Sequence, residues 1–502
     1  MRASPIFFLL LLILSPCVYS QGLSNFWISG YAIQSPPPWG NTTLNFFGGI
    51  PTSYFQQRNL DFNRTSITMS DLAGNLLFYS NGFSICNDNN DTMLNGAGID
   101  SSYVLTQWYN DGQPAAQTML VIPQPGNETR YYNIFHVTID TTWNNGVIAF
   151  ENALKLRHTI IDMTLDSGRG DVTQRELPLM YDTLSAGQVQ GVKHANGRDW
   201  WVLIPRYAGG VFYSFLVTPD TVNGPINQQL GPNLIGASIR HVIFSPDGNK
   251  YAFVDHRNHL LIYDFDRCTG VLSNAIQIPV LDSMIARGVA FSPNSRYLYM
   301  SSHLYLYQFD TWATNIAASQ ITVAEWDTFY SPQPPSATTF YLPMLANDDK
   351  IYINTSNATD RMHIINSPDS GGLACDVCQH CLNLPTLNSF TMPNYPNYFL
   401  GAETGSLCDT LTSVNEINNF AISLTIKPNP AQEYFWLDYN LPSNNHAILN
   451  IYNILGAKIF HRTLYSYFNT VKVECASLPS GMYIATVIQN NKLLGSAKFI
   501  KE

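Results

Sequence analysis

The chain has 502 residues, enough for two or three domains. Charged residues make up 12% of the chain, about half the usual share, and the net charge is −10. A chain with this charge is a poor match for the phosphate backbone of nucleic acid or for anionic lipid, so we expect neither as a partner.

Residues 1–20 are predicted to be a signal peptide. Arg2 supplies the positive start, Ile6–Leu14 is an uninterrupted apolar run, and Val18-Tyr19-Ser20 precedes a cleavage point. The apolar run is too short to span a bilayer, and no other stretch is long enough, so the mature chain should lack an integral membrane segment. An uncleaved anchor and, through Cys17, a lipoprotein are the alternatives.

Residues 21–412 have the pattern of an all-β domain. Runs rich in β-branched and aromatic residues, such as 75–79, 131–139 and 200–204, are each bounded by Gly, Pro, Asn or Asp. No long stretch of this segment shows the hydrophobic periodicity of a helix. We therefore expect many short strands joined by turns.

An internal repeat narrows the architecture. The segment 241–253 resembles 288–299, and both carry Phe-Ser-Pro ahead of a turn, with the phenylalanines at positions 244 and 291. Such a unit of about 40–50 residues with several strands is the size of one propeller blade. The pattern predicts a β-propeller of about seven blades. Tandem β-sandwich modules are the alternative.

Residues 413–420 are predicted to be a linker, and residues 421–502 a small Ig-like β-sandwich. The sandwich segment resembles the type A C-terminal sorting domain of the type IX secretion system of Bacteroidetes. The matching phrases are Lys427-Pro428-Asn429-Pro430, the stretch 451–458 with Gly456, and the stretch 478–483 with Gly481 and Tyr483. This resemblance implies recognition by the secretion translocon through Pro428, Asn429, Pro430, Gly456, Gly481 and Tyr483. An ordinary adhesive sandwich is the alternative.

The body is similar to a WD40-like or YVTN-like propeller family that often precedes such sorting domains. The similarity is carried by 69–82, 121–127, both Phe-Ser-Pro units and 392–395. To our knowledge this family has no settled activity, so the resemblance implies no functional residues. Together the two resemblances imply a protein secreted through the periplasm, or held on the outer surface, of a Gram-negative bacterium.

Six cysteines remain in the body once the signal peptide and the sorting domain are set aside. An exported chain meets an oxidising compartment, and an even number is compatible with three disulfides. The six candidates are Cys86, Cys268, Cys375, Cys378, Cys381 and Cys408. Zinc binding by the last cluster of three with His380 is the alternative, but a second ligand pair is missing. We expect no metal and no cofactor.

Possible O-glycosylation sites follow from a further resemblance. Bacteroidetes attach O-glycans at Asp followed by Ser or Thr and then a small or aliphatic residue. The candidate acceptors are Thr92, Thr141, Thr183, Thr221, Ser283 and Thr410.

Motifs for catalysis are missing from the sequence: it has neither a Gly-x-Ser-x-Gly elbow nor a His-Glu-x-x-His pair. No catalytic residue can be selected, and we expect a binding or adhesion module for a glycan or a protein rather than an enzyme. A surface hydrolase that cleaves polysaccharide with paired carboxylates in the propeller funnel is one alternative. A structural component of the surface layer is the other.

Overall fold

The computed structural model describes most of the chain from residue 22 onward. The described residues are 22–33, 35–49, 51–100, 102–108, 111–144, 147–236, 240–282, 284, 287–332, 334–388, 390–409, 422, 424–441, 446–453, 457–465, 469–489 and 492–502. The predicted signal peptide and the predicted linker 413–420 therefore lie outside the described residues.

The chain divides into two compact units, Met1–Asp409 and Thr410–Glu502. Each unit has hydrophobic clusters of its own, so each is described separately. Helices are few and short among the described residues: η1 (Gly22–Ser24), α1 (Tyr103–Trp108), η2 (Asp166–Gly168), η3 (Ala317–Ser319) and η4 (Gly372–Cys375). No helix in the described part of the chain is long and apolar enough to cross a membrane.

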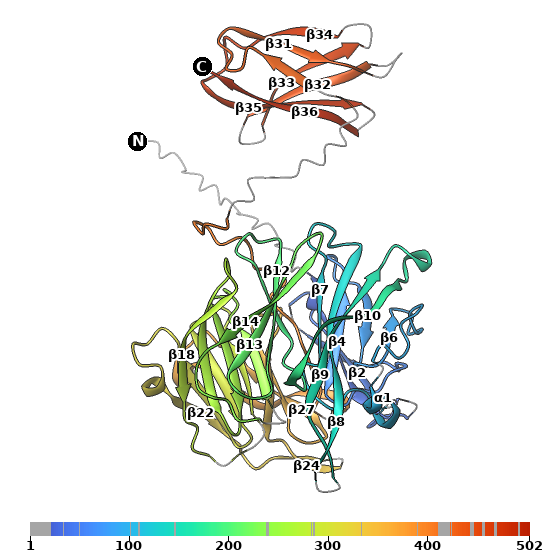
Figure 1. The fold of residues 1–502 in the computed structure, drawn as a ribbon, viewed down its shortest axis with the longest axis vertical. Helices are drawn as coiled ribbons and strands as arrows, with labels where there is room; N and C mark the ends of the chain where they lie inside the picture. The colour runs from blue at the N-terminus through green and yellow to red at the C-terminus, as the bar shows by residue number, and fades with distance from the viewer. Residues whose placement is uncertain are drawn as a thin grey trace, which may run out of the picture. The chain divides into compact units, whose positions relative to one another are not determined.

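The first unit is built from sheets arranged in a ring (Figure 1), and their strands pair antiparallel except for the parallel pair β29 and β4. Its described residues form one three-stranded sheet, six four-stranded sheets and a hairpin, β23 (Tyr330–Pro332) with β24 (Pro335–Ala337). The three-stranded sheet is β1 (Phe26–Tyr31), β2 (Gly40–Asn45) and β3 (Thr52–Phe55). The first three four-stranded sheets are β29 (Met392–Pro393) with β4 (Thr65–Ser70), β5 (Leu76–Ser80) and β6 (Ile85–Asn87); β7 (Met119–Pro123), β8 (Tyr131–Asn144), β9 (Val147–Asp162) and β10 (Asp171–Ser185); and β11 (Gln190–Lys193), β12 (Trp200–Pro205), β13 (Val211–Val217) and β14 (Val222–Gln229).

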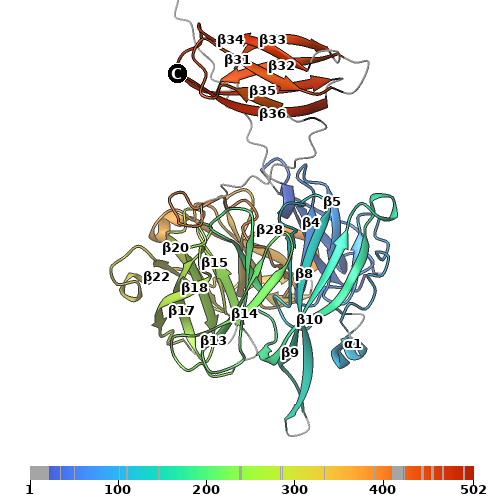
Figure 2. The same ribbon diagram turned by 45° about the horizontal axis from the view of Figure 1, so that its top comes forward.

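Three further sheets complete the ring. They are β15 (Arg240–Phe244), β16 (Lys250–Asp255), β17 (His259–Asp266) and β18 (Val271–Ile278); β19 (Arg287–Phe291), β20 (Tyr297–Ser302), β21 (Tyr305–Asp310) and β22 (Ile321–Glu325); and β25 (Phe340–Leu345), β26 (Ile351–Thr355), β27 (Thr359–Ile365) and β28 (Val377–Asn388). The long hairpin of β8 and β9 extends beyond the neighbouring sheets (Figure 2).

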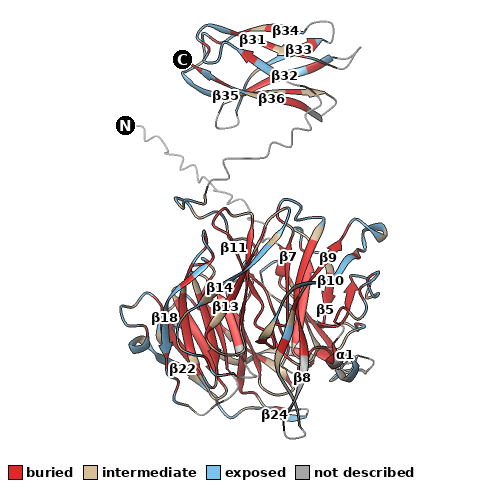
Figure 3. Cartoon of the chain, viewed as in Figure 1, coloured by how far each residue is buried: buried red, intermediate tan, exposed pale blue. Residues whose placement is uncertain are grey.

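The seven sheets of three or four strands are the blades of a β-propeller. The first strands β7, β11, β15, β19 and β25 contact one another in sequence around the axis, whereas β14, β18 and β22 are largely exposed at the rim. Burial mostly follows the same order: inner strands such as β11 and β19 are buried and the outer strands β14, β18 and β22 are largely exposed, although the outer strand β6 is buried (Figure 3). The all-β propeller expected from the sequence, with about seven blades, is confirmed.

The predicted repeat corresponds to the inner strands of consecutive blades. Residues 241–253 cover most of β15 and β16, and 288–299 cover most of β19 and the first half of β20. In the first turn the Ser245 hydroxyl donates to Asp247 at 2.5 Å and accepts from the Lys250 amide at 2.9 Å. In the second turn Ser292 makes the matching bonds to Asn294 and from Tyr297. The repeated Ser thus closes each turn with its side chain.

The second unit is a β-sandwich, as the sequence predicts. One sheet has β30 (Leu424–Lys427), β31 (Tyr434–Tyr439) and β34 (Thr470–Glu474); the other has β33 (Lys458–Tyr465), β32 (His446–Asn453), β35 (Gly481–Gln489) and β36 (Lys492–Lys501). Alternate residues of β31 face inward. The rings of Phe435 and Phe499 pack with their centroids 4.5 Å apart. The two sheets therefore share one apolar core.

The expectation of three disulfides in the body is wrong. The structure has two, Cys268–Cys408 and Cys378–Cys381, and the thiols of Cys86 and Cys375 are free. Cys86 is buried beside Phe62 and Tyr79, whereas Cys375 lies in a separate cluster between the β19–β22 and β25–β28 sheets. An even number of cysteines permits full pairing, but the fold keeps these two in different parts of the core.

Four buried histidines predict that acid weakens the propeller. Burial lowers the pKa of His136 and His363 to about 3 and that of His158 and His241 to about 4. The unfolded chain binds these protons near pH 6.5, so stability present above that pH is lost as pH falls from about 6.5 towards 4. Each histidine contributes roughly 1–2 kcal/mol of this loss at pH 5.

The measurement is the midpoint of urea unfolding at pH 7.5 and at pH 5.0, where we expect a clearly lower midpoint. Burial also raises the pKa of Asp100 to about 7 and raises those of Asp61 and Asp348; these carboxyls act in the opposite direction, and we expect the four histidines to outweigh them. Equal midpoints at the two pH values would contradict this prediction.

Candidate functional site

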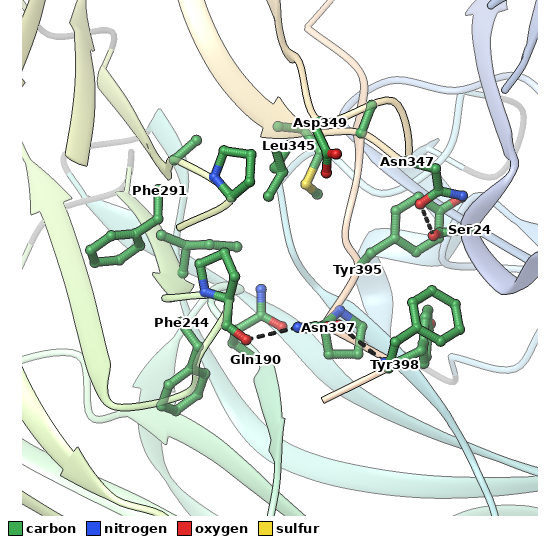
Figure 4. Close-up of a pocket in the computed structure, with 18 of the residues that line it drawn as sticks. Ser24, Gln190, Phe244, Phe291, Leu345, Asn347, Asp349, Tyr395, Asn397 and Tyr398 are labelled. Carbon is green, nitrogen blue, oxygen red and sulfur yellow. Dashed lines mark hydrogen bonds between the residues drawn. The ribbon is translucent and has the colours of Figure 1, made fainter. Parts of the chain in front are cut away.

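A cavity of about 390 Å³ lies in the propeller where several inner strands end (Figure 4). We call it the axial cavity. Its lining residues come from η1, from strands β1, β11, β15, β19 and β25 with the turns after them, and from the segment after β29. They are Ser24, Trp27, Gln190, Gly191, Ile243, Phe244, Pro246, Ala290, Phe291, Pro293, Met344, Leu345, Ala346, Asn347, Asp349, Tyr395, Pro396, Asn397, Tyr398 and Phe399.

The Phe-Ser-Pro repeats form one wall of the axial cavity. Phe244 and Phe291 end β15 and β19, and Pro246 and Pro293 follow in the turns. The two turns are linked, because the Asp247 amide donates to the Ser295 hydroxyl at 3.0 Å. The same local sequence in neighbouring blades therefore places the same apolar groups side by side.

Residues 391–409, which we call the axial strap, pass through the centre of the ring and form the opposite wall. Asn394 is buried at the axis. Its Nδ2 donates to the carbonyls of Met119 (2.8 Å) and Val189 (2.9 Å), and its Oδ1 accepts from Gln117 and Gln190. One amide side chain thus joins the strap to two blades directly.

Gln117 extends this network to a third blade. Its Nε2 donates to the Val242 carbonyl at 2.8 Å, and its Oε1 accepts from the Val242 amide at 3.0 Å. Gln117 lies just before β7, and Val242 lies on β15, which is two blades further along the ring. The buried amides therefore replace the backbone pairing that inner strands of different blades cannot give one another.

The two tyrosines of the strap face the cavity with their rings and the protein with their hydroxyls. The Tyr395 hydroxyl donates to the Phe26 carbonyl at 2.6 Å, and that of Tyr398 donates to the Val121 carbonyl at 2.9 Å. Burial raises the pKa of both phenols above the ordinary value of a tyrosine. Both groups are thus neutral at physiological pH and offer a ligand apolar surface.

The amide side chains that line the cavity also bond within the protein. Asn347 accepts from Ser24 at 2.8 Å and donates to Asn25 at 2.7 Å. Asn397 donates to the Pro246 carbonyl at 2.7 Å and accepts from the Phe399 amide at 3.0 Å. Gln190 donates to Asn394 and accepts from the Gly191 amide. Each of these amides thus has one N–H and one acceptor position in use within the protein and one of each left.

Asp349 is the one carboxylate that lines the axial cavity among the described residues. It is exposed at the edge, and its carboxylate has no hydrogen bond or ion pair within the described part of the chain. Two further exposed carboxylates lie on turns next to the lining, outside it: Asp247 follows Pro246, and Asp369 accepts at 3.0 Å from the amide of Asn294, which follows Pro293. The rim is therefore acidic.

The far part of the axial strap is fixed to the third and fourth four-stranded sheets. Arg267 donates to the Gly401 carbonyl at 2.5 Å, the Glu403 amide donates to the Ala195 carbonyl at 2.8 Å, and Cys408 is bonded to Cys268. A wall of the cavity is thus covalently tied to the blade that contains β17. This disulfide limits how far the strap can move.

None of the described site residues predicted in the first unit belongs to the lining of the axial cavity. Cys378 and Cys381 lie on β28, and no group of three or more His, Cys, Asp and Glu side chains that could hold a metal occurs in the described ranges. Thr92 and Thr221 are exposed and Thr183 is half-buried, while the side chains of Thr141, Ser283 and Thr410 lie outside the description. These glycosylation sites remain predictions.

The residues of the sorting motif lie in the second unit. Asn429 bonds to β36, because it donates to the Lys498 carbonyl and accepts from the Ile500 amide. The Tyr483 hydroxyl donates to the Pro479 carbonyl at 2.7 Å. Gly456 lies outside the described residues. The motif therefore joins strand ends within the sandwich, and its recognition by a translocon remains a prediction.

Comparison with known families identifies the second unit. Residues 425–502 match the family model described as "Secretion system C-terminal sorting domain". This unit is a sorting domain. The protein carrying it is thereby marked for export to the cell surface or for secretion. No curated protein matches the chain at a significant level.

Solved structures similar to the chain are distant ones. A Bacteroides fragilis protein provisionally described as a 6-phosphogluconolactonase is 12% identical, with 75% of this chain and 99% of that chain covered and a TM-score of 0.42. A functionally unknown protein from Desulfotomaculum acetoxidans is 14% identical, with 73% and 99% covered and a TM-score of 0.37. The Dos1 propeller is 10% identical, with 76% and 96% covered and a TM-score of 0.36. None of these similarities extends a function to this chain.

Sequence reasoning missed the axial cavity. The Phe-Ser-Pro units predict turns, and the phrase 392–395 carries a family resemblance, but neither pattern indicates a wall of a site. The available signal was the repeat itself, since equivalent positions of neighbouring blades must lie at the same end of the ring. No comparable sequence pattern indicates that residues 391–409 run along the axis of the ring.

Replacing Asn394 by alanine should destabilise the propeller strongly. The change removes four hydrogen bonds and leaves the Gln117 and Gln190 amides and two carbonyls without this partner in the core. We expect a loss of about 2–4 kcal/mol in the free energy of unfolding, measured by urea titration. The control is Asn89→Ala on an exposed turn, which should cost less than about 0.5 kcal/mol. Equal effects of the two substitutions would refute the central role of Asn394.

Proposed function

We propose that this exported propeller is a binding module and that its ligand occupies the axial cavity. The observation that carries the proposal is the composition of the cavity: aromatic and aliphatic walls with amides, and Asp349 as the carboxylate on its edge. A pocket of about 300–1,000 Å³ with apolar walls and few polar groups is typical of ligand sites. The ligand is a glycan or a protein segment.

The hydrolase alternative finds less support in the same cavity. Glycoside cleavage needs two carboxyl groups about 5–10 Å apart across the reacting bond. Asp349 has no second carboxylate among the lining residues. We therefore favour binding over catalysis for this site.

For the route of export we propose the type IX system of a Gram-negative bacterium, with passage through the periplasm. The match of 425–502 to a sorting domain supports this proposal. Residues 421–502 then act as the address that the outer-membrane translocon reads, and the propeller is the part that works outside the cell.

Deleting residues 421–502 should prevent export beyond the periplasm. The deletion removes the sandwich with its own core and leaves the propeller clusters intact, so a folded but retained protein is the expected result. Cell fractionation and surface labelling of the producing strain measure it. Normal display of the shortened protein at the surface would contradict the proposed role of the sandwich.

Filling the axial cavity should abolish binding. Leu345 is half-buried on its wall, so Leu345→Trp adds a large ring in the space a ligand would use. The purified full chain would be tested on printed glycans and on immobilised peptides. We expect signals from at least one of the two classes, with at least about tenfold weaker binding by the variant.

The matched control is Leu373→Trp on η4, where the leucine is 78% exposed and lies outside the cavity lining. This control should bind like the unmodified chain, and both variants should keep its unfolding temperature. Binding that survives Leu345→Trp would place the ligand elsewhere.

A further inference from the structure

We propose that the axial cavity takes a protein segment in which a large apolar side chain fills the cavity and a neighbouring lysine or arginine pairs with Asp349. This inference rests on the proposed function and specifies its ligand class. It follows from which polar atoms of the cavity are already used, from its size and from the charge of its rim.

The interior of the cavity suits an apolar group. The hydroxyls of Tyr395 and Tyr398 donate to backbone carbonyls, and Asn347, Asn397 and Gln190 each use both ends of their amides within the protein. What these residues present to a ligand is mostly ring and methylene surface. Burial of an apolar side chain there gains free energy without breaking any of these bonds.

A sugar is a weaker match for the same interior. Each hydroxyl that a sugar brings into the cavity must exchange its bonds to water for bonds to the protein, and an unpaired buried hydroxyl is costly. Asn347, Asn397 and Gln190 each have one N–H and one acceptor position left, and Asp349, the carboxylate of the described lining, lies at the edge. A polyhydroxylated ligand would have to pair each buried hydroxyl with one of these few remaining positions, whereas an apolar side chain needs none of them.

The size of the cavity indicates an anchor rather than an entire ligand. A volume of about 390 Å³ is close to the lower limit for sites that enclose a small molecule. Protein interfaces commonly use one aromatic or large aliphatic side chain in such a pocket, surrounded by a polar rim that remains wet. The cavity, with its half-buried prolines and exposed acidic residues at the edge, has this arrangement.

The charge of the rim selects the neighbouring residue. Asp349, Asp247 and Asp369 are exposed, whereas the nearby cations are engaged elsewhere. Lys350 donates to Asn366 at 3.0 Å, and Arg267 is buried with its guanidinium on backbone carbonyls. A ligand with a lysine or arginine next to its apolar anchor would complement this rim and would be steered towards it.

The test begins with selection of peptides from a random dodecapeptide library on the immobilised full chain. We expect selected sequences to combine an aromatic or large aliphatic residue with an adjacent Lys or Arg. Titration calorimetry with a synthetic copy then measures affinity. Changing its apolar anchor to Ala, or using the Leu345→Trp chain, should weaken binding at least about tenfold.

Asp349→Asn isolates the charge. Asp349 has a φ of 61°, a conformation that asparagine also adopts, so this variant should keep the fold. We expect it to lower affinity for the cationic peptide by about two- to fivefold, the range for an exposed ion pair, and less at high salt. Affinity for a copy with Gln in place of Lys or Arg should not change. Glu474→Gln, at an exposed carboxylate of the sorting domain, is the control and should have no effect.

The outcomes separate this inference from the proposed function. Glycan binding that Leu345→Trp abolishes, without any peptide selected, would overturn the peptide ligand and leave the binding function standing. Selected peptides without cations, or an Asp349→Asn chain with unchanged affinity, would overturn the role of the rim charge. Failure of both glycans and peptides to bind in a cavity-dependent manner would overturn the two proposals together.

Discussion

The hydrogen bonds of one buried amide hold the centre of this propeller together. Inner strands of neighbouring blades pack against each other but do not pair, so the axis of the ring lacks a continuous ladder of backbone bonds. Asn394 supplies the missing links to the Met119 and Val189 carbonyls and, through Gln117, to Val242. The axial strap is thereby part of the core and cannot be regarded as a loose tail of the domain.

This arrangement determines what kind of site the propeller can offer. Because the strap occupies the axis, the ring is not an open channel, and the space that remains is a cavity with the strap as one wall. Polar side chains of that wall, such as Asn394 and Asn397, make hydrogen bonds that hold the strap in place. The site is consequently apolar inside and acidic at its edge, which suits recognition of an apolar group beside a cation better than hydrolysis of a glycoside.

The two units divide the work of the chain. The sandwich has its own apolar core and matches a secretion sorting domain, and the propeller has a separate set of clusters and the axial cavity. Disulfides are consistent with an exported protein. Cys268–Cys408 ties the strap to the blade beside it, and Cys378–Cys381 bridges within a single strand, so only the first bears on the shape of the cavity.

The sequence by itself determined the features that depend on neighbouring residues. Alternating strands, the Ser-Pro-Asp-Gly turn, the repeat of Phe244 and Phe291, and the phrases of the sorting domain are all local, and they predicted a propeller of about seven blades followed by a sandwich. Tertiary structure decided which distant groups meet. Cys268 and Cys408 are 140 residues apart, and Asn394 meets Met119 across 275.

Such meetings depend on ring closure, because the strap begins with β29, which pairs with β4 far earlier in the chain. No local pattern records that geometry. Even the count of cysteines therefore misled, since Cys86 and Cys375 are each buried in a core cluster that the other does not share. The cavity was unpredictable for the same reason: its walls come from strands and turns between residues 24 and 399 and exist only once the ring has closed around the strap.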